Sequence, residues 1–162
     1  MITTINEFRN FFESMHKFIV YHNTTEGHKN KIMQNGFQIV PNIRGNLYGN
    51  GIYFSFKPNK RWGDFTIKCE VKCNNTLIDY NDDLIYEDTD LGKSIIQFGE
   101  QYLQNWIPGT TFEHNKDLWK EALNQFIKYN KYDSLITYEY GNQILVVFDP
   151  KIITILNNDY NN

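Results

Sequence analysis

The stretch from Asp64 to Lys72 alternates between polar and apolar residues, and this pattern constrains the fold more than any other feature of the chain. One face of an extended strand here would carry the apolar side chains, namely Phe65, Ile67, Cys69 and Val71. Such alternation predicts a half-buried strand of an antiparallel sheet, because strands of parallel sheets are buried on both faces and are apolar throughout.

The other predicted elements follow no regular β-α-β order. Helical spacing of apolar residues predicts helices over residues 4–17, from Thr24 or Thr25 to about residue 34, over 92–106 and over 115–130. Short apolar runs predict strands over residues 18–22, 37–40, 52–56, 134–138, 144–148 and 152–156. Residues 74–92 are polar and acidic, and we interpret them as a solvated surface excursion. This order predicts an α+β fold with antiparallel sheets rather than a doubly wound parallel sheet.

The length and composition predict one folded domain over residues 1–156, followed by a disordered tail over 157–162. A hydrophobic fraction of 41% and an aromatic fraction of 16% are typical of a folded, sheet-containing protein. The net charge of −3 argues against a protein that binds duplex nucleic acid. The local basic cluster of Lys57, Lys60 and Arg61 is interpreted as a solvated loop.

Cysteine and histidine spacing predicts neither a disulfide nor a metal site. Cys69 and Cys73 would lie roughly 13 Å apart on one face of a strand, too far for a bridge. We therefore expect free thiols in a reducing compartment. His16, His28 and His114 have no partners at metal-ligand spacing and are interpreted as surface residues. Without a membrane-length apolar run or a signal peptide, we expect a cytoplasmic protein with no membrane partner.

Two residues, His22 and Tyr53, lie next to or within short apolar runs and are suited to hold a dinucleotide. His22 follows the run Phe18–Tyr21, and Tyr53 follows the flexible turn Gly49-Asn50-Gly51, whose glycines allow a close backbone approach to a ligand. The chain has no Gly-x-Gly-x-x-Gly between a strand and a helix, and no Walker-type loop. A nucleotide would therefore have to bind by other means.

Four motifs occur in a recognisable order: His22-Asn23-Thr24, Asn35-Gly36-Phe37, Gly49-Asn50-Gly51-Ile52-Tyr53-Phe54 and Ile144–Pro150. This order resembles the poly(ADP-ribose) polymerase-like, diphtheria-toxin-like ADP-ribosyltransferases. The similarity is most specific over residues 18–56 and absent over 74–130. It implies split antiparallel sheets around an NAD cleft, with flanking helices.

The resemblance also implies roles for individual residues. His22 would hydrogen-bond the adenosine ribose, and the backbone of Asn23 would pair with the nicotinamide carboxamide. Tyr53 would stack on the nicotinamide ring, and Trp62 would supply a second stacking wall. The cofactor-binding candidates are therefore His22, Asn23, Thr24, Tyr53, Ser55 and Trp62.

The chain departs from the family pattern at two positions. Asn23 stands where the family has glycine, and Asn tolerates a positive φ better than most residues. Ile144 stands where the family has a catalytic glutamate. Gln143 would take this position if the strand began one residue earlier, and Glu139 would reach it from the preceding turn. Ile144, Gln143 and Glu139 are therefore the candidates for the catalytic position.

These expectations favour a mono-ADP-ribosyltransferase that cleaves the nicotinamide–ribose bond of NAD+ and transfers ADP-ribose to a protein or nucleic-acid acceptor. NAD+ would be its substrate, with no metal. Two alternatives stay open. One is a catalytically inactive module that binds NAD, ADP-ribose or a partner protein, and the other is a relative that uses NAD to modify RNA.

Overall fold

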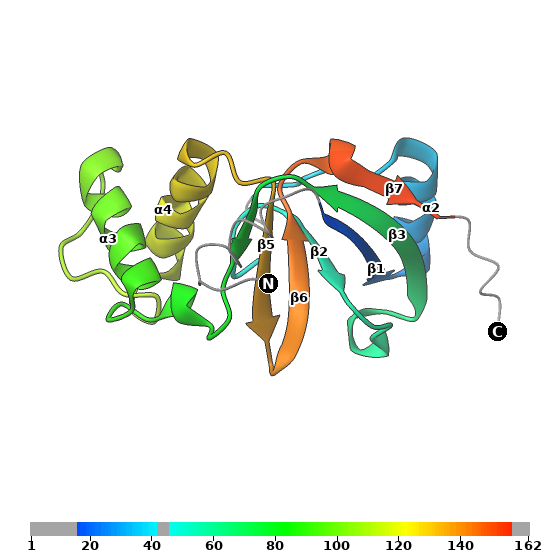
Figure 1. Cartoon of the computed structure of the whole chain (residues 1–162), viewed down its shortest axis with the longest axis horizontal. Coiled ribbons are helices and arrows are strands. Elements are labelled where there is room, and N and C mark those ends of the chain that lie inside the picture. Colours follow the sequence, from blue (N-terminus) through cyan, green and yellow to red (C-terminus); the bar gives the residue numbers. More distant parts are fainter. Residues whose placement is uncertain (1–15, 42–45, 157–162) are drawn as a thin grey trace, which may run out of the picture.

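Seven strands form one sheet in the order β4-β5-β6-β2-β1-β3-β7 in the computed structural model, which describes residues 16–41 and 46–156 (Figure 1). The strands are β1 (His16–Thr24), β2 (Ile52–Ser55), β3 (Phe65–Cys73), β4 (Thr76–Ile78), β5 (Ser134–Glu139), β6 (Asn142–Val147) and β7 (Ile153–Ile155). Neighbours are antiparallel except β4 and β5, which are parallel. The predicted α+β class is confirmed, and the alternating segment forms β3.

The described residues form three α-helices, α2 (Glu26–Asn35), α3 (Asp90–Tyr102) and α4 (Lys116–Tyr129). They also form three short 3-10 helices in connecting segments: η1 (Lys60–Trp62), η2 (Asp83–Ile85) and η3 (Pro150–Ile152). The side chains of Thr89 and Asn115 cap α3 and α4 by accepting hydrogen bonds from backbone N–H groups of the first turn. Helices α3 and α4 lie together at one end of the molecule, and α2 lies near the other end (Figure 1).

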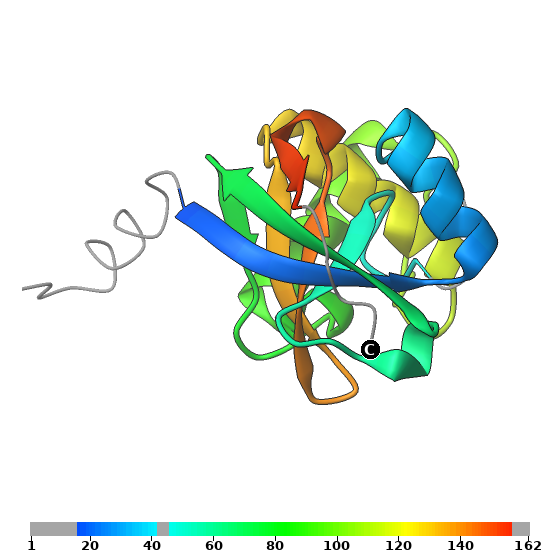
Figure 2. The same cartoon turned by 90° about the vertical axis from the view of Figure 1, so that its right-hand side faces the viewer.

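The sheet bends sharply where β2 meets β1. Strand β1 pairs with β3 along its whole length, but it shares one register pair with β2, between Tyr21 and Ser55. Figure 2 shows β1 and β3 running across the direction of β5 and β6. The two halves of the sheet are therefore joined by little hydrogen bonding, and a cavity lies at this junction.

Two hydrophobic clusters occupy the two faces of the sheet. The first packs α3 and α4 against β5 and β6, and it includes Trp119, Leu123 and Ile144. The second joins the two halves of the bent sheet, and it includes Phe54 and Cys69. Both cysteines are buried, free thiols, as the spacing predicts.

The strand predicted over residues 37–40 is wrong. This segment is irregular and pairs with no strand in the described part of the sheet. Phe37 and Ile39 instead pack against the second cluster. The apolar side chains of this segment thus reflect a loop that packs on the core. Such a loop gives the same sequence pattern as a paired strand.

Residues 74–92 are not a solvated excursion throughout. They contain β4 and the first turn of α3, and the Asp79 side chain is buried. The Asp79 carboxylate accepts hydrogen bonds from the backbone N–H of Asp83 at 2.7 Å and from the Thr137 hydroxyl at 2.9 Å. Burial of this acidic group is possible because these donors replace water.

The predicted ends of two helices, at residues 17 and 106, are wrong. Most of the helix predicted over 4–17 lies outside the described residues, as does the predicted tail over 157–162. His16 and Lys17 belong to β1, where Lys17 forms an ion pair of 3.8 Å with Glu70 on β3. Helix α3 ends at Tyr102 instead of residue 106.

No helix among the described residues is long and apolar enough to cross a membrane.

Candidate functional site

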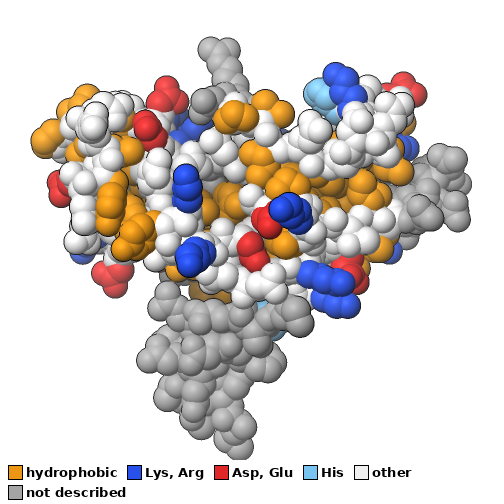
Figure 3. Space-filling model, turned by 90° about the horizontal axis from the view of Figure 1, so that it is seen from above, with side chains coloured by type: hydrophobic (Ala, Val, Ile, Leu, Met, Phe, Trp, Pro, Cys, Tyr) orange, Lys and Arg blue, Asp and Glu red, His pale blue; other side chains and the backbone are white. Residues whose placement is uncertain are grey.

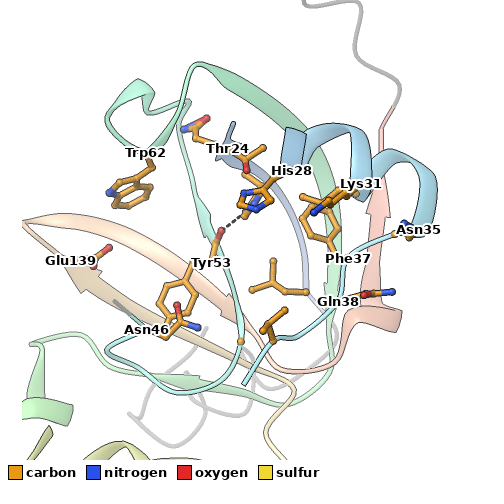
Figure 4. Close-up of a pocket in the computed structure, with 17 residues that line it drawn as sticks. Thr24, His28, Lys31, Asn35, Phe37, Gln38, Asn46, Tyr53, Trp62 and Glu139 are labelled. Atoms are coloured by element: carbon orange, nitrogen blue, oxygen red, sulfur yellow. Dashed lines mark hydrogen bonds between the residues drawn. The ribbon is translucent and has the colours of Figure 1, made fainter. Parts of the chain in front are cut away.

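A cavity of about 630 Å³ lies at the bend of the sheet, within the range of roughly 300–1,000 Å³ typical of small-molecule sites (Figure 4). Its walls come from β1, α2, the segment before β2, β2 itself, η1 and the end of β5. Five of the six predicted cofactor-binding residues line it: His22, Asn23, Thr24, Tyr53 and Trp62.

His22 is held in one orientation by three contacts. Its Nδ1 lies 2.9 Å from the Tyr53 carbonyl oxygen, and its ring packs edge-on against Phe37 at 5.2 Å and Phe54 at 5.7 Å. Because a carbonyl only accepts, Nδ1 donates, and Nε2 of the neutral ring is an acceptor. Burial lowers the pKa of His22; the Tyr53 carbonyl opposes this effect, and nearby His28 adds to it. The structure thus brings two other motif residues, Phe37 and Tyr53, into contact with His22.

Tyr53 forms a fixed wall of the cavity. Its hydroxyl donates to the Gly49 carbonyl at 3.0 Å and accepts from the Tyr48 N–H at 3.0 Å. Burial raises the pKa of Tyr53 well above its ordinary value, and the charge of Glu139 raises it further. The phenol therefore stays neutral, and its ring is anchored at the outer end by the glycine turn.

Asn23 and Gly63 bring the η1 segment against β1. The Asn23 amide nitrogen donates to the Asn59 carbonyl, and the Asn23 amide oxygen accepts from the Thr66 hydroxyl at 2.8 Å. Gly63 has a φ of +141°, and a Cβ at this position would collide with the Thr24 backbone. The glycine permits this close approach, which places neighbouring Trp62 at the cavity.

Ser55, the sixth cofactor-binding candidate, lies away from the cavity lining. Its side chain is buried, and its hydroxyl donates to the Tyr21 carbonyl at 3.3 Å. Tyr21 and Ser55 are also the register pair between β1 and β2. The geometry therefore gives Ser55 a structural position, where it connects the two halves of the sheet.

The three candidates for the catalytic position lie in different environments. Ile144 pairs with Ser55 and is fully buried in the first cluster, and Gln143 is exposed opposite Tyr138. Neither residue lines the cavity, whereas Glu139, the last residue of β5, does. Burial raises the pKa of Glu139, and the positive charge of Arg61 acts in the opposite direction.

Sequence reasoning missed the contribution of α2 and its flanking segment to this cavity. His28 is exposed, as interpreted from the sequence, and it also lines the cavity together with Lys31, Asn35 and Gln38. The spacing of residues 28, 31 and 35 places them on one helical face, a signal that was present in the sequence. Residues 16–41 and 46–156 contain no group of His, Cys, Asp or Glu side chains suited to hold a metal ion.

Comparisons with known proteins add little to this geometry. No protein-family model matches the chain, and a search of curated proteins finds no match. Among solved structures, the chain is similar to one described as the crystal structure of an anti-CRISPR protein. The two share 12% sequence identity and a TM-score of 0.42, over 88% of this chain and 94% of that one. A similarity this weak supports neither a fold family nor a function.

Proposed function

We propose that the protein is an NAD-dependent mono-ADP-ribosyltransferase. One observation carries this proposal: residues from four separate elements, His22, Tyr53, Trp62 and Glu139, line one cavity at the bend of the sheet. Together they offer a neutral imidazole, two aromatic rings and a carboxylate. The single register pair between β1 and β2 also favours the split-sheet arrangement that the family resemblance implies.

These side chains suit the two chemically different parts of the nicotinamide riboside. The rings of Tyr53 and Trp62 would hold the cationic pyridinium by stacking, because aromatic faces attract positive charge. Nε2 of neutral His22 would accept a hydrogen bond from a ribose hydroxyl. The Asn23 side chain already binds Asn59 and Thr66, so its backbone would be the part that pairs with the carboxamide.

In the proposed reaction, the bond between the ribose C1′ and the nicotinamide nitrogen breaks, and its electron pair leaves with nicotinamide. An acceptor oxygen or nitrogen then bonds to C1′, and Glu139 takes the proton that the acceptor loses. The carboxylate would also stabilise the positive charge that develops on the ribose. The remaining contribution of the protein is orientation of the dinucleotide.

Glu139 takes this role in the proposal because it is the carboxylate that lines the cavity. The strand position at which the family has glutamate is Ile144, whose side chain is buried among apolar residues. A charged side chain could not occupy that environment without a large cost in stability. The carboxylate would thus approach from β5 instead of β6.

A second candidate is a binding module without catalysis, which the buried Ile144 favours. RNA modification is less well supported. The Lys and Arg side chains on the face shown in Figure 3 are interspersed with Asp and Glu instead of forming a continuous basic surface. Nucleic acid binding without sequence recognition depends on such a surface.

The test is incubation with NAD+ labelled in the adenylate part, followed by measurement of nicotinamide release and of label transfer. We expect turnover by the wild-type protein and strong losses in His22→Ala, Tyr53→Ala and Glu139→Gln. Glu113→Gln, an exposed residue outside the cavity, is the matched control and should leave turnover unchanged. Circular dichroism establishes that each variant is folded.

Turnover that persists unchanged in His22→Ala and Tyr53→Ala would contradict the assignment. Calorimetry with a non-hydrolysable NAD analogue separates the two candidate functions. Binding together with turnover supports the transferase, and binding without turnover supports the module. A mass-spectrometric survey of modified proteins and nucleic acids would then identify the acceptor.

A further inference from the structure

Helix α2 turns a polar face toward the cavity, called here its inward face, and the His28, Lys31 and Asn35 side chains on this face remain exposed to solvent. Residues 28, 31, 32 and 35 line the cavity, and their spacing places them on one side of the helix. Of these four residues only Ile32 is apolar, and no residue of α2 is fully buried. A helix that covers a protein core normally presents an apolar stripe to it. Helix α2 instead presents His28, Lys31 and Asn35 to the cavity.

The charge on this face has no acidic partner in the described part of the chain. Lys31 lines the cavity, and its side chain forms no ion pair there. Its neighbour Lys29 differs, because it lies outside the cavity lining with its ammonium 5.2 Å from the centre of the Phe65 ring. A cation that faces a cavity without a carboxylate beside it is suited to an anionic ligand group.

The cavity also has a chemical polarity from one side to the other. Figure 4 shows Trp62 and Glu139 on one side and Lys31, Asn35 and Gln38 on the opposite side, with Tyr53 and His28 between them. One side therefore offers an indole ring and a carboxylate, and the other offers a cation and hydrogen-bond donors beside the Phe37 ring. NAD+ has the complementary polarity, because its pyridinium is cationic and its pyrophosphate is anionic.

We propose that the inward face of α2 is a phosphate subsite, in which Lys31 neutralises the pyrophosphate and His28 and Asn35 donate hydrogen bonds to it. This inference rests on the proposed function and adds the direction in which the dinucleotide lies. The pyrophosphate is held at α2, and the nicotinamide lies between Tyr53 and Trp62. It also explains why the helix after the histidine strand has a polar inward face.

The test is isothermal titration calorimetry of the whole chain with ADP-ribose, ADP and adenosine. Lys31→Met should weaken the binding of ADP-ribose and of ADP about ten-fold or more, because this is the loss expected for a hydrogen bond to a charged group. Adenosine binding should stay unchanged, because adenosine has no phosphate. His28→Ala should weaken the binding of the two phosphate-bearing ligands by a smaller factor. Lys29→Met, which removes the same charge from the same helix, should leave all three affinities unchanged.

Failure of the phosphate-subsite proposal and failure of the proposed function would give different results. Wild-type affinity of Lys31→Met for ADP-ribose, with turnover of NAD+ intact, would overturn the phosphate subsite alone. If Lys31→Met weakened the binding of adenosine and of ADP-ribose equally, the phosphate subsite would also be overturned, because the effect would not depend on phosphate. Weaker binding of a short single-stranded RNA, with ADP-ribose unaffected, would overturn it in favour of an acceptor site. Failure of the wild-type protein to bind NAD+ or ADP-ribose would contradict the proposed function itself.

Discussion

The His22 side chain is held in one orientation by its neighbours, which suits the binding role that we propose for it. Its Nδ1 is occupied by the Tyr53 carbonyl and its ring is packed by Phe37 and Phe54, so one nitrogen remains as an acceptor. A side chain that is already ordered loses little conformational entropy on binding. Replacing Phe37 would therefore disturb the site although Phe37 has no polar group.

Arg61 is expected to set the pH dependence of turnover through Glu139. Burial raises the pKa of Glu139, and the Arg61 charge lowers it, so Arg61→Gln should raise this pKa further. Because the proposed base acts as a carboxylate, activity falls as the pH drops through its pKa. The acidic limb of the rate profile should thus move to higher pH in Arg61→Gln.

The pH–rate profile of kcat/KM measures this shift, with Lys57→Gln from the same basic segment as the control. An acidic limb that stays in place, or that moves to lower pH, would show that Arg61 does not act on the catalytic base. Arg61 also lies over the Tyr140 ring at 4.8 Å, so circular dichroism should verify that the variant keeps its fold.

The two thiols are expected to be unreactive in the native protein. Burial raises the pKa of Cys69 to about 12 and that of Cys73 to about 11. Little thiolate therefore exists near pH 8, and a disulfide reagent should react slowly until denaturant is added. In the unfolded chain both thiols lose protons near their ordinary value, so the free energy of unfolding should decrease as the pH rises above about 8.5. Rapid labelling of both cysteines in the folded protein would contradict their burial.

Tyr48 joins the elements that place Tyr53 and Glu139 at the cavity. Its N–H donates to the Tyr53 hydroxyl, and its own hydroxyl lies 2.7 Å from the Tyr138 carbonyl and 3.0 Å from an Asp82 carboxylate oxygen. The segment before β2 is thereby tied to the end of β5, next to Glu139. Helix α4 supports the same segment, because the Asn124 side chain accepts from the Asn50 N–H at 2.8 Å.

Tyr48→Phe should therefore destabilise the protein and reduce turnover together. Loss of the hydroxyl leaves a partly buried acceptor without its donor, which costs roughly 1–3 kcal/mol. Urea unfolding measures the first effect, and kcat measures the second, since Glu139 would lose its anchor. Tyr86→Phe, at a half-exposed tyrosine outside both hydrophobic clusters, is the control. Full stability and full turnover in Tyr48→Phe would show that this connection does not position Glu139.

The whole molecule has two hydrophobic clusters that meet across a sheet with a weakly paired junction. The first cluster holds β5 and β6 to the α3–α4 pair, and the second holds β1 and β3 across the bend. The cavity spans both halves, because His22 belongs to one half and Tyr53 to the other. A ligand in this cavity would therefore connect the two halves more firmly than the strand pairing does.

Binding of NAD+ is accordingly expected to stabilise the whole fold. A ligand at one hundred times its Kd adds about 2.7 kcal/mol, which corresponds to an increase in Tm of about 5–10 °C for a chain of this length. Thermal unfolding followed by circular dichroism measures the shift, and Tyr53→Ala should abolish it. Hydrogen exchange should slow most in β1 and β2. An unchanged Tm at saturating NAD+ would contradict binding at the junction.

Local sequence patterns predict several helices and strands correctly and fail for other segments. The alternation of Phe65 to Val71 corresponds to β3, and Thr25 and Gly36 flank α2 at the predicted cap positions, although the Thr25 side chain makes no capping hydrogen bond. The same alternation misled over Phe37 to Val40, where the apolar side chains pack without a strand partner. Asp79 was misread because the donors that permit its burial lie four and fifty-eight residues away.

The chain order of motifs, the cysteine spacing and most element types could be read without coordinates, because each depends on residues close together in the sequence. The position of Glu139 at the cavity, the burial of Ile144 and the polar inward face of α2 could not. They depend on the register between β5 and β6 and on the bend between β1 and β2, which are set by packing between segments far apart in the chain.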